Sequence, residues 1–254
     1  MQLSLSNGIF ANLKLRENLA AVKQFGFDNV EFNMKSVQTG HDTAAYQAKK
    51  LLADIDLHCL TLHAATFPVT DPIETHRAVY YAKISADFAH ELGAETMVIH
   101  SSIHRNTPST QRRKLLARIY EEVVPYSKDL GLNLALENLA ESSSHAYGKD
   151  PAEVNEILNA IPGGEEIGIT LDTSHAAATG NMIELVNAYH SRLLNVHISN
   201  PKHRPITEET PELKAFIAKL KFYEYRGPLT IELGNKCTAT EIQQTKLILQ
   251  NLIT

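Results

Sequence analysis

Acidic and imidazole side chains recur where short apolar segments of this 254-residue chain end. The last residues of these segments are His63, His100, Glu137, Asp172, His197 and Glu232. Carboxylates gathered with imidazoles in one buried place would leave unpaired charge, and desolvating that charge costs several kcal/mol. A bound cation removes this cost. The pattern therefore predicts a divalent-metal site.

The oxygen-rich members of this set are the predicted ligands of the principal metal. They are Glu137, Asp172, His197 and Glu232. Three carboxylates with one imidazole suit Mn²⁺, Zn²⁺, Co²⁺ or Mg²⁺, and the ligand types do not choose among these ions. His63 and His100 predict a second, nitrogen-richer site that shares Glu137 and suits zinc. Alternatively, these two histidines orient substrate or hydrogen-bond across the site.

Other titratable residues lie close to this pattern. His175 stands three positions after Asp172, so we expect it in the first turn after that strand, lining the same cavity. His203 follows the strand that ends at His197, and it either reaches the site or is an exposed loop histidine. Glu31 either points into the site or pairs with a lysine. The remaining histidines are expected at the surface: His41, His58, His76, His90, His104, His145 and His190.

Strand-like and helix-like segments alternate along the whole chain. The predicted strands are Leu3–Ser6, Asn29–Phe32, His58–His63, Thr96–His100, Asn133–Glu137, Gly168–Asp172, Leu194–His197 and Leu229–Glu232. The predicted helices are Arg16–Phe25, Thr43–Ile55, Ile73–Leu92, Gln111–Leu130, Ala152–Asn159, Met182–His190, Glu212–Lys221 and Glu241–Leu252. Gly26, Gly93 and Gly131 are typical helix-ending residues.

Strict alternation without hairpins predicts an α/β protein with a parallel sheet. No glycine-rich phosphate loop follows the first strand, so a dinucleotide-binding sheet is not supported. Eight strand–helix units favour a single (β/α)8 TIM barrel, and we expect one domain over residues 1–254. In such a barrel the carboxyl ends of the strands converge on one mouth, where active sites are built.

Composition restricts the partners and the compartment. The formal net charge of −5 disfavours a nucleic-acid partner without excluding one, because backbone binding needs clustered Lys and Arg. Cys59 and Cys237 lie far apart and imply neither a disulfide framework nor a thiolate zinc site. We find no signal-peptide pattern and no run of about 18 apolar residues. We therefore expect a cytoplasmic protein without a membrane partner, and an oligomer is compatible with this composition.

Six short motifs resemble those of the xylose isomerase-like barrel superfamily, which holds sugar isomerases and epimerases as well as the endonuclease IV type of DNA repair nuclease. They are Leu62-His63-Ala64, Val98-Ile99-His100, Ala135-Leu136-Glu137-Asn138, Leu171-Asp172-Thr173-Ser174-His175-Ala176, Val196-His197 and Gly227-Pro228-Leu229-Thr230-Ile231-Glu232-Leu233. Their order and spacing cover nearly the whole chain. The resemblance implies that Glu137, Asp172, His197 and Glu232 bind the principal metal.

The resemblance to endonuclease IV implies a larger ligand set. It comprises His63, His100, Glu137, Asp172, His175, His197, His203 and Glu232. The aspartate expected two positions before His203 is Pro201, so a third zinc would lose a ligand. The stretches after His63, around Asp172 and after His197 also depart from the signatures of that family. A zinc-dependent phosphodiesterase acting on DNA is therefore the alternative to a sugar enzyme.

The favoured prediction is that the protein is a metal-dependent isomerase or epimerase of a sugar or sugar phosphate, acting by proton transfer next to a carbonyl. In similar epimerases, the residues that match Glu137 and Glu232 flank a chelated ketose, one removing the proton and the other returning it. His175 would hold a substrate oxygen. Moving the proton between adjacent carbons would instead interconvert aldose and ketose. A barrel that binds without catalysis is a third alternative.

Basic residues in two loops are candidate ligands for a substrate phosphate. Lys202, His203 and Arg204 follow the seventh strand, and a guanidinium can grip two phosphate oxygens. Further bases follow the fourth strand, at His104, Arg105, Arg112, Arg113 and Lys114. Ordinary solvated surface charge is the alternative interpretation of both groups.

Overall fold

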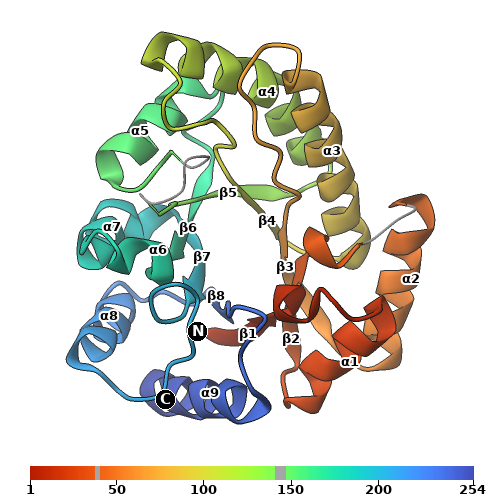
Figure 1. The fold of residues 1–254 in the computed structure, drawn as a ribbon, viewed down its shortest axis with the longest axis vertical. Coiled ribbons are helices and arrows are strands. Elements are labelled where there is room, and N and C mark those ends of the chain that lie inside the picture. The colour runs from red at the N-terminus through yellow and green to blue at the C-terminus, as the bar shows by residue number, and fades with distance from the viewer. Residues whose placement is uncertain (38–40, 141–146) are drawn as a thin grey trace.

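Eight parallel strands form a closed barrel in which each strand pairs with its neighbours in sequence and β8 returns to β1 (Figure 1). The computed structural model describes residues 1–37, 41–140 and 147–254, with the backbone alone for residues 41–44. The strands are β1 Gln2–Ser6, β2 Asn29–Asn33, β3 His58–His63, β4 Thr96–Ile99, β5 Asn133–Glu137, β6 Gly168–Asp172, β7 Leu193–Ile198 and β8 Pro228–Ile231. The predicted TIM barrel is confirmed.

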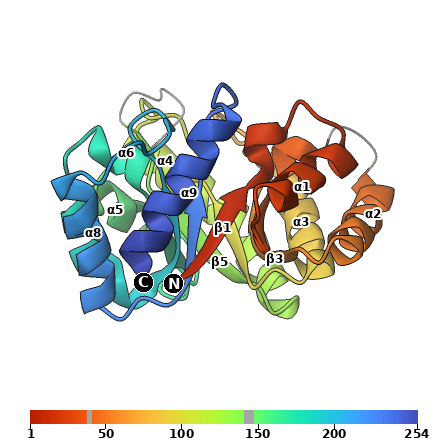
Figure 2. The same ribbon diagram turned by 90° about the horizontal axis from the view of Figure 1, so that it is seen from below.

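Helices surround the barrel and connect consecutive strands (Figure 2). They are α1 Leu15–Gln24, α2 His41–Asp54, α3 Thr75–Leu92, α4 Ser109–Asp129, α5 Pro151–Ala160, α6 Thr173–Ala177, α7 Met182–Tyr189, α8 Pro211–Phe222 and α9 Ala239–Ile253. The eight predicted helices are present, and the short helix α6 was not predicted. In the described part of the chain, no helix combines the length and apolar character needed to cross a membrane.

Three helices end in a left-handed turn that leads into the next strand. Gly26, Gly93 and Gly131 have φ angles of 73°, 76° and 73°. A residue with a side chain is strained at such angles, whereas glycine is not. The glycines that the sequence marks as helix ends therefore act as expected.

The two faces of the barrel strands differ in chemistry. The face toward the helices is apolar: the rings of Phe32 in β2 and Phe88 in α3 lie 6.2 Å apart between centroids. The interior face carries polar side chains that are fully buried, namely Ser4, Thr61, Thr170, Asn195 and Thr230. TIM-barrel interiors are more often filled by branched apolar residues. This polar interior needs internal hydrogen bonds or water, because an unpaired buried polar group is costly.

A network of ion pairs and stacking ties α4 to α5 and to the chain before α5. Arg112 lies 3.2 Å from Glu156 between Nη2 and Oε1, and its guanidinium is 3.5 Å from the Tyr147 ring centroid. Glu156 also accepts hydrogen bonds from the Tyr147 hydroxyl and from Ser109 Oγ. The Tyr147 hydrogen bond is the largest of several effects that lower the pKa of Glu156 to about 2. The folded protein therefore stabilises the ionised form of the Glu156 side chain more than its protonated form.

We expect Glu156→Gln to lower the free energy of unfolding near pH 7 by about 1.5–3 kcal/mol, the range for hydrogen bonds to a charged group. Because the folded-state pKa is depressed from 4.5 to about 2, the stabilisation is complete above pH 4.5 and disappears as the pH falls toward 2. Urea unfolding at about pH 7, 4 and 3 measures this difference. The exposed Glu165, changed to Gln, is the control. A cost that does not depend on pH would contradict the assignment.

Candidate metal centre and active site

The candidate centre lies at the carboxyl ends of strands β3 to β8, at one mouth of the barrel. His63, Glu137 and Asp172 are the last residues of their strands, and His197 is the last but one of β7. His100 and Glu232 come directly after β4 and β8, one residue beyond the observed strand ends. The strand predictions were therefore one residue too long at these two positions. The closed barrel brings all six side chains to the same end.

The predicted principal ligands converge in the structure. Glu137, Asp172, His197 and Glu232 each offer one ligand atom, and these atoms all lie within 4.8 Å of one another. His197 Nδ1 is 3.1 Å from Glu232 Oε2, 3.7 Å from Glu137 Oε2 and 3.7 Å from Asp172 Oδ2. Glu137, Asp172 and His197 are almost completely buried, while Glu232 is partly exposed.

Several of these atoms make no hydrogen bond within the described residues. Asp172 Oδ2, His197 Nδ1 and Glu232 Oε2 are buried there with ion-pair contacts of 3.1–3.9 Å only. Buried polar atoms in native proteins are nearly always satisfied by protein, water or an ion. Two carboxylate oxygens and one imidazole nitrogen aimed at a common point are a donor set that divalent cations bind. The residues present therefore fit a divalent metal.

The histidines predicted for a second site also lie against Glu137. His100 Nε2 is 2.9 Å from Glu137 Oε2, and His63 Nε2 is 3.3 Å from the same oxygen. The two imidazole rings meet edge to face with centroids 5.0 Å apart. Without an ion, these contacts are hydrogen bonds. Because one carboxylate and two imidazoles are close enough to share an ion, the cluster can bind a metal.

A third cluster contains Asp172, His175 and His203. Asp172 is the N-cap of α6: its Oδ1 accepts a hydrogen bond of 2.7 Å from the backbone N–H of His175. This bond orients the carboxylate so that Oδ2 stays available. The first turn of α6 places His175 with Nδ1 3.3 Å from Glu137 Oε1. An aspartate before a short polar turn is a capping signal, and it would have predicted α6.

His203 reaches the centre through an unusual turn. Lys202 and His203 have φ angles of 64° and 51°, which non-glycine residues rarely adopt. The His203 backbone N–H donates to Ser174 Oγ, and Nδ1 lies 3.6 Å from Glu232 Oε2 and 3.9 Å from Asp172 Oδ2. Such conformations persist only where surrounding contacts hold them. Of the two alternatives for His203, the structure gives the one in which it reaches the site.

The candidate phosphate ligands of the two loops differ in exposure and in their ion-pair partners. Lys202 and Arg204 are exposed, and Arg204 Nε donates to the Pro201 carbonyl. In the other loop, Arg105 lies 2.9 Å from Glu153 Oε1 and Arg112 pairs with Glu156. Carboxylates of α5 thus already pair with Arg105 and Arg112, and the exposed Lys202 and Arg204 remain the candidate phosphate ligands.

Two buried residues outside the clusters, Asn138 and Glu31, contact cluster residues by hydrogen bonds. Asn138 accepts a 2.7 Å hydrogen bond from the Asp172 backbone N–H and donates one of 3.1 Å to the Asp172 carbonyl. Its own carbonyl lies 2.9 Å from His175 Nδ1. Of the two alternatives for Glu31, the structure is nearer to the first: among the described residues it pairs with no lysine, and it points into the barrel below the mouth, with its Oε2 2.8 Å from His197 Nε2. Sequence reasoning had assigned no such supporting role to either residue.

Burial and charge act against each other on the titratable groups. Burial alone would raise the pKa of Glu137, but the imidazoles of His100 and His197 hold it well below its usual range. Burial would lower the pKa of His197, but Glu31, Glu232 and Glu137 raise it well above its usual range. The pKa of His175 rises to about 10 by attraction to Asp172 and Glu137. A cation would replace these protons, so its binding should release them.

None of the other described histidine side chains belongs to the three clusters. His58, His76, His90 and His190 are exposed, as predicted, and His104 is half-buried with its Nδ1 accepting from the Asn106 backbone. The side chain of His41 and the whole of His145 lie outside the described residues.

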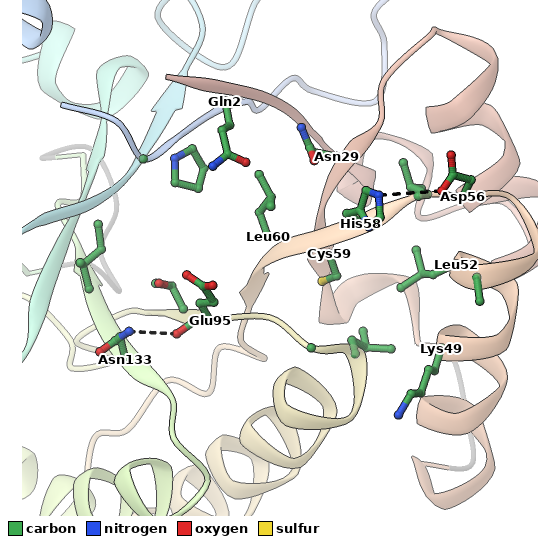
Figure 3. A pocket seen from close by; sticks show the side chains of 18 of the residues that line it. Gln2, Asn29, Lys49, Leu52, Asp56, His58, Cys59, Leu60, Glu95 and Asn133 are labelled. Atoms are coloured by element: carbon green, nitrogen blue, oxygen red, sulfur yellow. Dashed lines mark hydrogen bonds and ion pairs between the residues drawn. The ribbon is translucent and has the colours of Figure 1, made fainter. Parts of the chain in front are cut away.

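A cavity of about 920 Å³ opens at the opposite end of the barrel, among the amino ends of the strands (Figure 3). Polar groups there bind within the protein: Asn133 Nδ2 donates to the Glu95 carbonyl, and His58 Nε2 lies 3.8 Å from Asp56 Oδ1. The cluster residues do not line it. Active sites of this architecture form at the carboxyl ends of the strands. The cavity at the amino ends is therefore not a candidate for the active site.

Two curated proteins share part of this sequence. An uncharacterised protein of Methanocaldococcus jannaschii is 27% identical over 158 residues, which are 58% of this chain and 53% of that protein. The probable endonuclease 4 of Mycoplasma pneumoniae is 26% identical over 111 residues, 44% of this chain and 38% of that protein. The aligned regions thus span about half or less of these relatives.

Solved structures match the fold over nearly its full length. A D-tagatose 3-epimerase-like protein has a TM-score of 0.82 at 20% identity, with 100% of this chain and 97% of that chain covered. An AP endonuclease of family 2 from Brucella melitensis has a TM-score of 0.78 at 14% identity, with 94% and 95% covered. The IolI protein with bound zinc has a TM-score of 0.74 at 19% identity, with 100% and 98% covered.

The family model described as "Xylose isomerase-like TIM barrel" matches residues 19–252, a span that contains every residue of the three clusters. The resemblance inferred from six short motifs is thereby confirmed. The chain belongs to the xylose isomerase-like TIM barrel family.

Proposed function

We propose that this protein is a divalent-metal-dependent isomerase or epimerase of a sugar or sugar phosphate, acting by proton transfer next to a carbonyl. The observation that carries the proposal is the convergence of Glu137, Asp172, His197 and Glu232, with three of their ligand atoms buried and without a hydrogen bond to any described residue. The similarity of the fold to a D-tagatose 3-epimerase-like protein agrees with it.

Glu137, Asp172, His197 and Glu232 would hold the metal. A bound Mn²⁺, Zn²⁺, Co²⁺ or Mg²⁺ would supply Lewis-acid polarisation of a substrate carbonyl. Asp172 has one oxygen committed to the cap of α6, so it contributes a single fixed oxygen. It has no freedom to act as a proton carrier as well. That task falls to the other carboxylates.

Glu137 and Glu232 are the proposed proton carriers. Each has a depressed pKa, so each is an anion near neutral pH and can accept a proton from carbon. Glu232 is partly exposed at the mouth, whereas Glu137 lies deeper on the side of β5. If one removes the proton and the other returns it, a carbon is inverted; if one carboxylate moves it between carbons, aldose and ketose interconvert. His175 is partly exposed beside these carboxylates, so its ring can contact a substrate oxygen.

One observation favours a second candidate function. Three clusters of ligand atoms, two of them sharing Glu137 and two sharing Asp172, could hold more than one ion. Such a multinuclear centre would suit a zinc-dependent phosphodiesterase acting on DNA. Against it, Pro201 stands where that family has a ligand aspartate. The number of bound ions distinguishes the two: one favours isomerisation, and two or three zincs favour hydrolysis.

The first test counts the metal. Purified protein dialysed against excess Mn²⁺ or Zn²⁺ and then against buffer is expected to retain about one ion per chain by elemental analysis. Glu232→Gln should weaken binding, because a hard cation loses an anionic ligand. Glu241→Gln, which changes the exposed capping carboxylate of α9, is the control for lost charge. Full occupancy and activity of Glu232→Gln after exposure to a chelator would refute the ligand set.

The second test looks for the proton transfer itself. Metal-loaded protein in deuterated water should exchange a carbon-bound hydrogen next to the carbonyl of a ketose, seen by NMR across a panel of free and phosphorylated sugars. Glu137→Gln and Glu232→Gln should each slow exchange by about 100-fold or more, the usual worth of a general base. The same preparation is assayed on a duplex that contains an abasic site. Efficient cleavage without any exchange would establish the nuclease instead.

The third test asks whether the substrate carries a phosphate. If the exposed Lys202 and Arg204 grip it, Arg204→Ala should raise KM for a phosphorylated substrate by about tenfold or more, the equivalent of losing about 1.5–3 kcal/mol of charged hydrogen bonding. The unphosphorylated analogue should respond little, and the exposed Arg226→Ala is the control. Equal losses on both substrates, or none, would leave these residues as surface charge and indicate a neutral sugar.

A further inference from the structure

Glu31 is a buried carboxylate without a Lys or Arg partner in the described part of the chain. It stands in the middle of β2 and points into the barrel, with no solvent exposure. The cost of burying a carboxylate is met only where good hydrogen bonds or an opposite charge surround it. Its partners therefore indicate what it does.

All of its hydrogen-bond partners converge on the oxygen Oε2. Thr61 Oγ1 donates at 2.9 Å, Asn195 Nδ2 at 3.2 Å and His197 Nε2 lies at 2.8 Å. The amide of Asn195 is itself oriented, since its Oδ1 accepts a hydrogen bond of 3.1 Å from Thr230 Oγ1. Buried side chains of β3, β7 and β8 thus fix this carboxylate from several directions.

The contact with His197 spans the interior of the barrel. β2 and β7 are not neighbours, because β1 and β8 lie between them. Asn195 and His197 are two residues apart on β7, so they point to the same interior face, where both meet Glu31. The carboxylate lies directly beneath the candidate metal ligands, on the side away from the mouth.

This geometry decides which nitrogen of His197 can bind a metal. A neutral imidazole has one protonated nitrogen and one lone pair. With Nε2–H donated to Glu31, the lone pair is on Nδ1. That atom is buried and makes no hydrogen bond to the described residues, and it lies 3.1 Å from Glu232 Oε2 and 3.7 Å from Asp172 Oδ2.

We infer that Glu31 is a positioning residue of the metal centre: its carboxylate receives the Nε2–H of His197 and holds Nδ1 as the ligand atom. The inference rests on the proposed metal centre, but it does not depend on the substrate or the reaction. Histidine ligands commonly donate their other N–H to a carboxylate, which fixes the tautomer and increases the basicity of the ligand nitrogen.

A purely structural role makes a different prediction. If Glu31 only fills the polar interior, replacing it changes the stability of the barrel and leaves zinc affinity unchanged once the protein is folded. If it positions His197, affinity falls even in a folded variant, and a side chain that keeps the acceptor oxygen restores it. Gln can present its amide oxygen where Oε2 stands, while Leu cannot.

The experiment measures zinc affinity of the full chain by competition with a chromophoric chelator, with folding checked by circular dichroism and thermal unfolding. Glu31→Leu should bind zinc about 10–100-fold more weakly than the wild type, and Glu31→Gln should recover most of that loss. Thr170→Val is the matched control, because this buried hydroxyl lies two residues before Asp172 on β6 and makes no hydrogen bond to the described residues. It should bind zinc as the wild type does.

A second measurement needs no variant of Glu31. In zinc-loaded protein labelled with ¹⁵N-histidine, the resonances of His197, identified by their absence in His197→Asn, should show a protonated Nε2 and a zinc-bound Nδ1. Zinc on Nε2 would overturn the inference, as would wild-type affinity in folded Glu31→Leu. If the wild type binds no zinc, or if His197→Asn binds it as tightly, the metal centre itself is wrong. Loss of zinc in His197→Asn but not in Glu31→Leu would refute only the role of Glu31.

Discussion

Buried negative charge is the constraint on which the rest of this molecule depends. Glu31, Glu137 and Asp172 are almost free of solvent, and Glu232 is partly so. In the described part of the chain, their ion-pair partners are imidazoles rather than Lys or Arg. Because imidazoles can give up their protons, such a cluster can exchange protons for a cation. A cluster built on Arg could not do so, because a guanidinium stays charged at neutral pH.

This constraint explains two departures from an ordinary barrel. Part of the interior is polar because Glu31 needs hydrogen-bond donors at its own depth, and Thr61 and Asn195 supply them. The turn at Lys202 and His203 adopts left-handed angles because His203 has to come back over the mouth toward Asp172 and Glu232. The polar interior and the left-handed turn each lower stability locally. The first orients His197, and the second brings His203 to the centre.

The sequence was sufficient for the barrel and for the location of the centre. Alternating apolar strands and glycine-terminated helices fix the fold class, and parallel strands bring their carboxyl ends together, so His63, Glu137 and Asp172 could be grouped from their positions alone. Contacts between distant elements could not be foreseen. Glu31 meets a histidine 166 positions later, across the barrel, and Arg105 meets Glu153 48 positions later. Nothing local to Glu31 or Arg105 specifies the partner, because tertiary packing makes the choice.

In the proposed function, Glu137 is the residue on which the type of reaction would depend. It belongs to the principal cluster with Asp172, His197 and Glu232, and also to the cluster with His63 and His100. A carboxylate with one oxygen on one ion keeps a lone pair with which to accept a proton from carbon. If Glu137 held two ions, it would lose that basicity, and the site would then suit the activation of water for hydrolysis. The same side chains can therefore support proton transfer or phosphodiester cleavage. The factor that separates the two is whether His63 and His100 bind a second ion or keep their hydrogen bonds to Glu137.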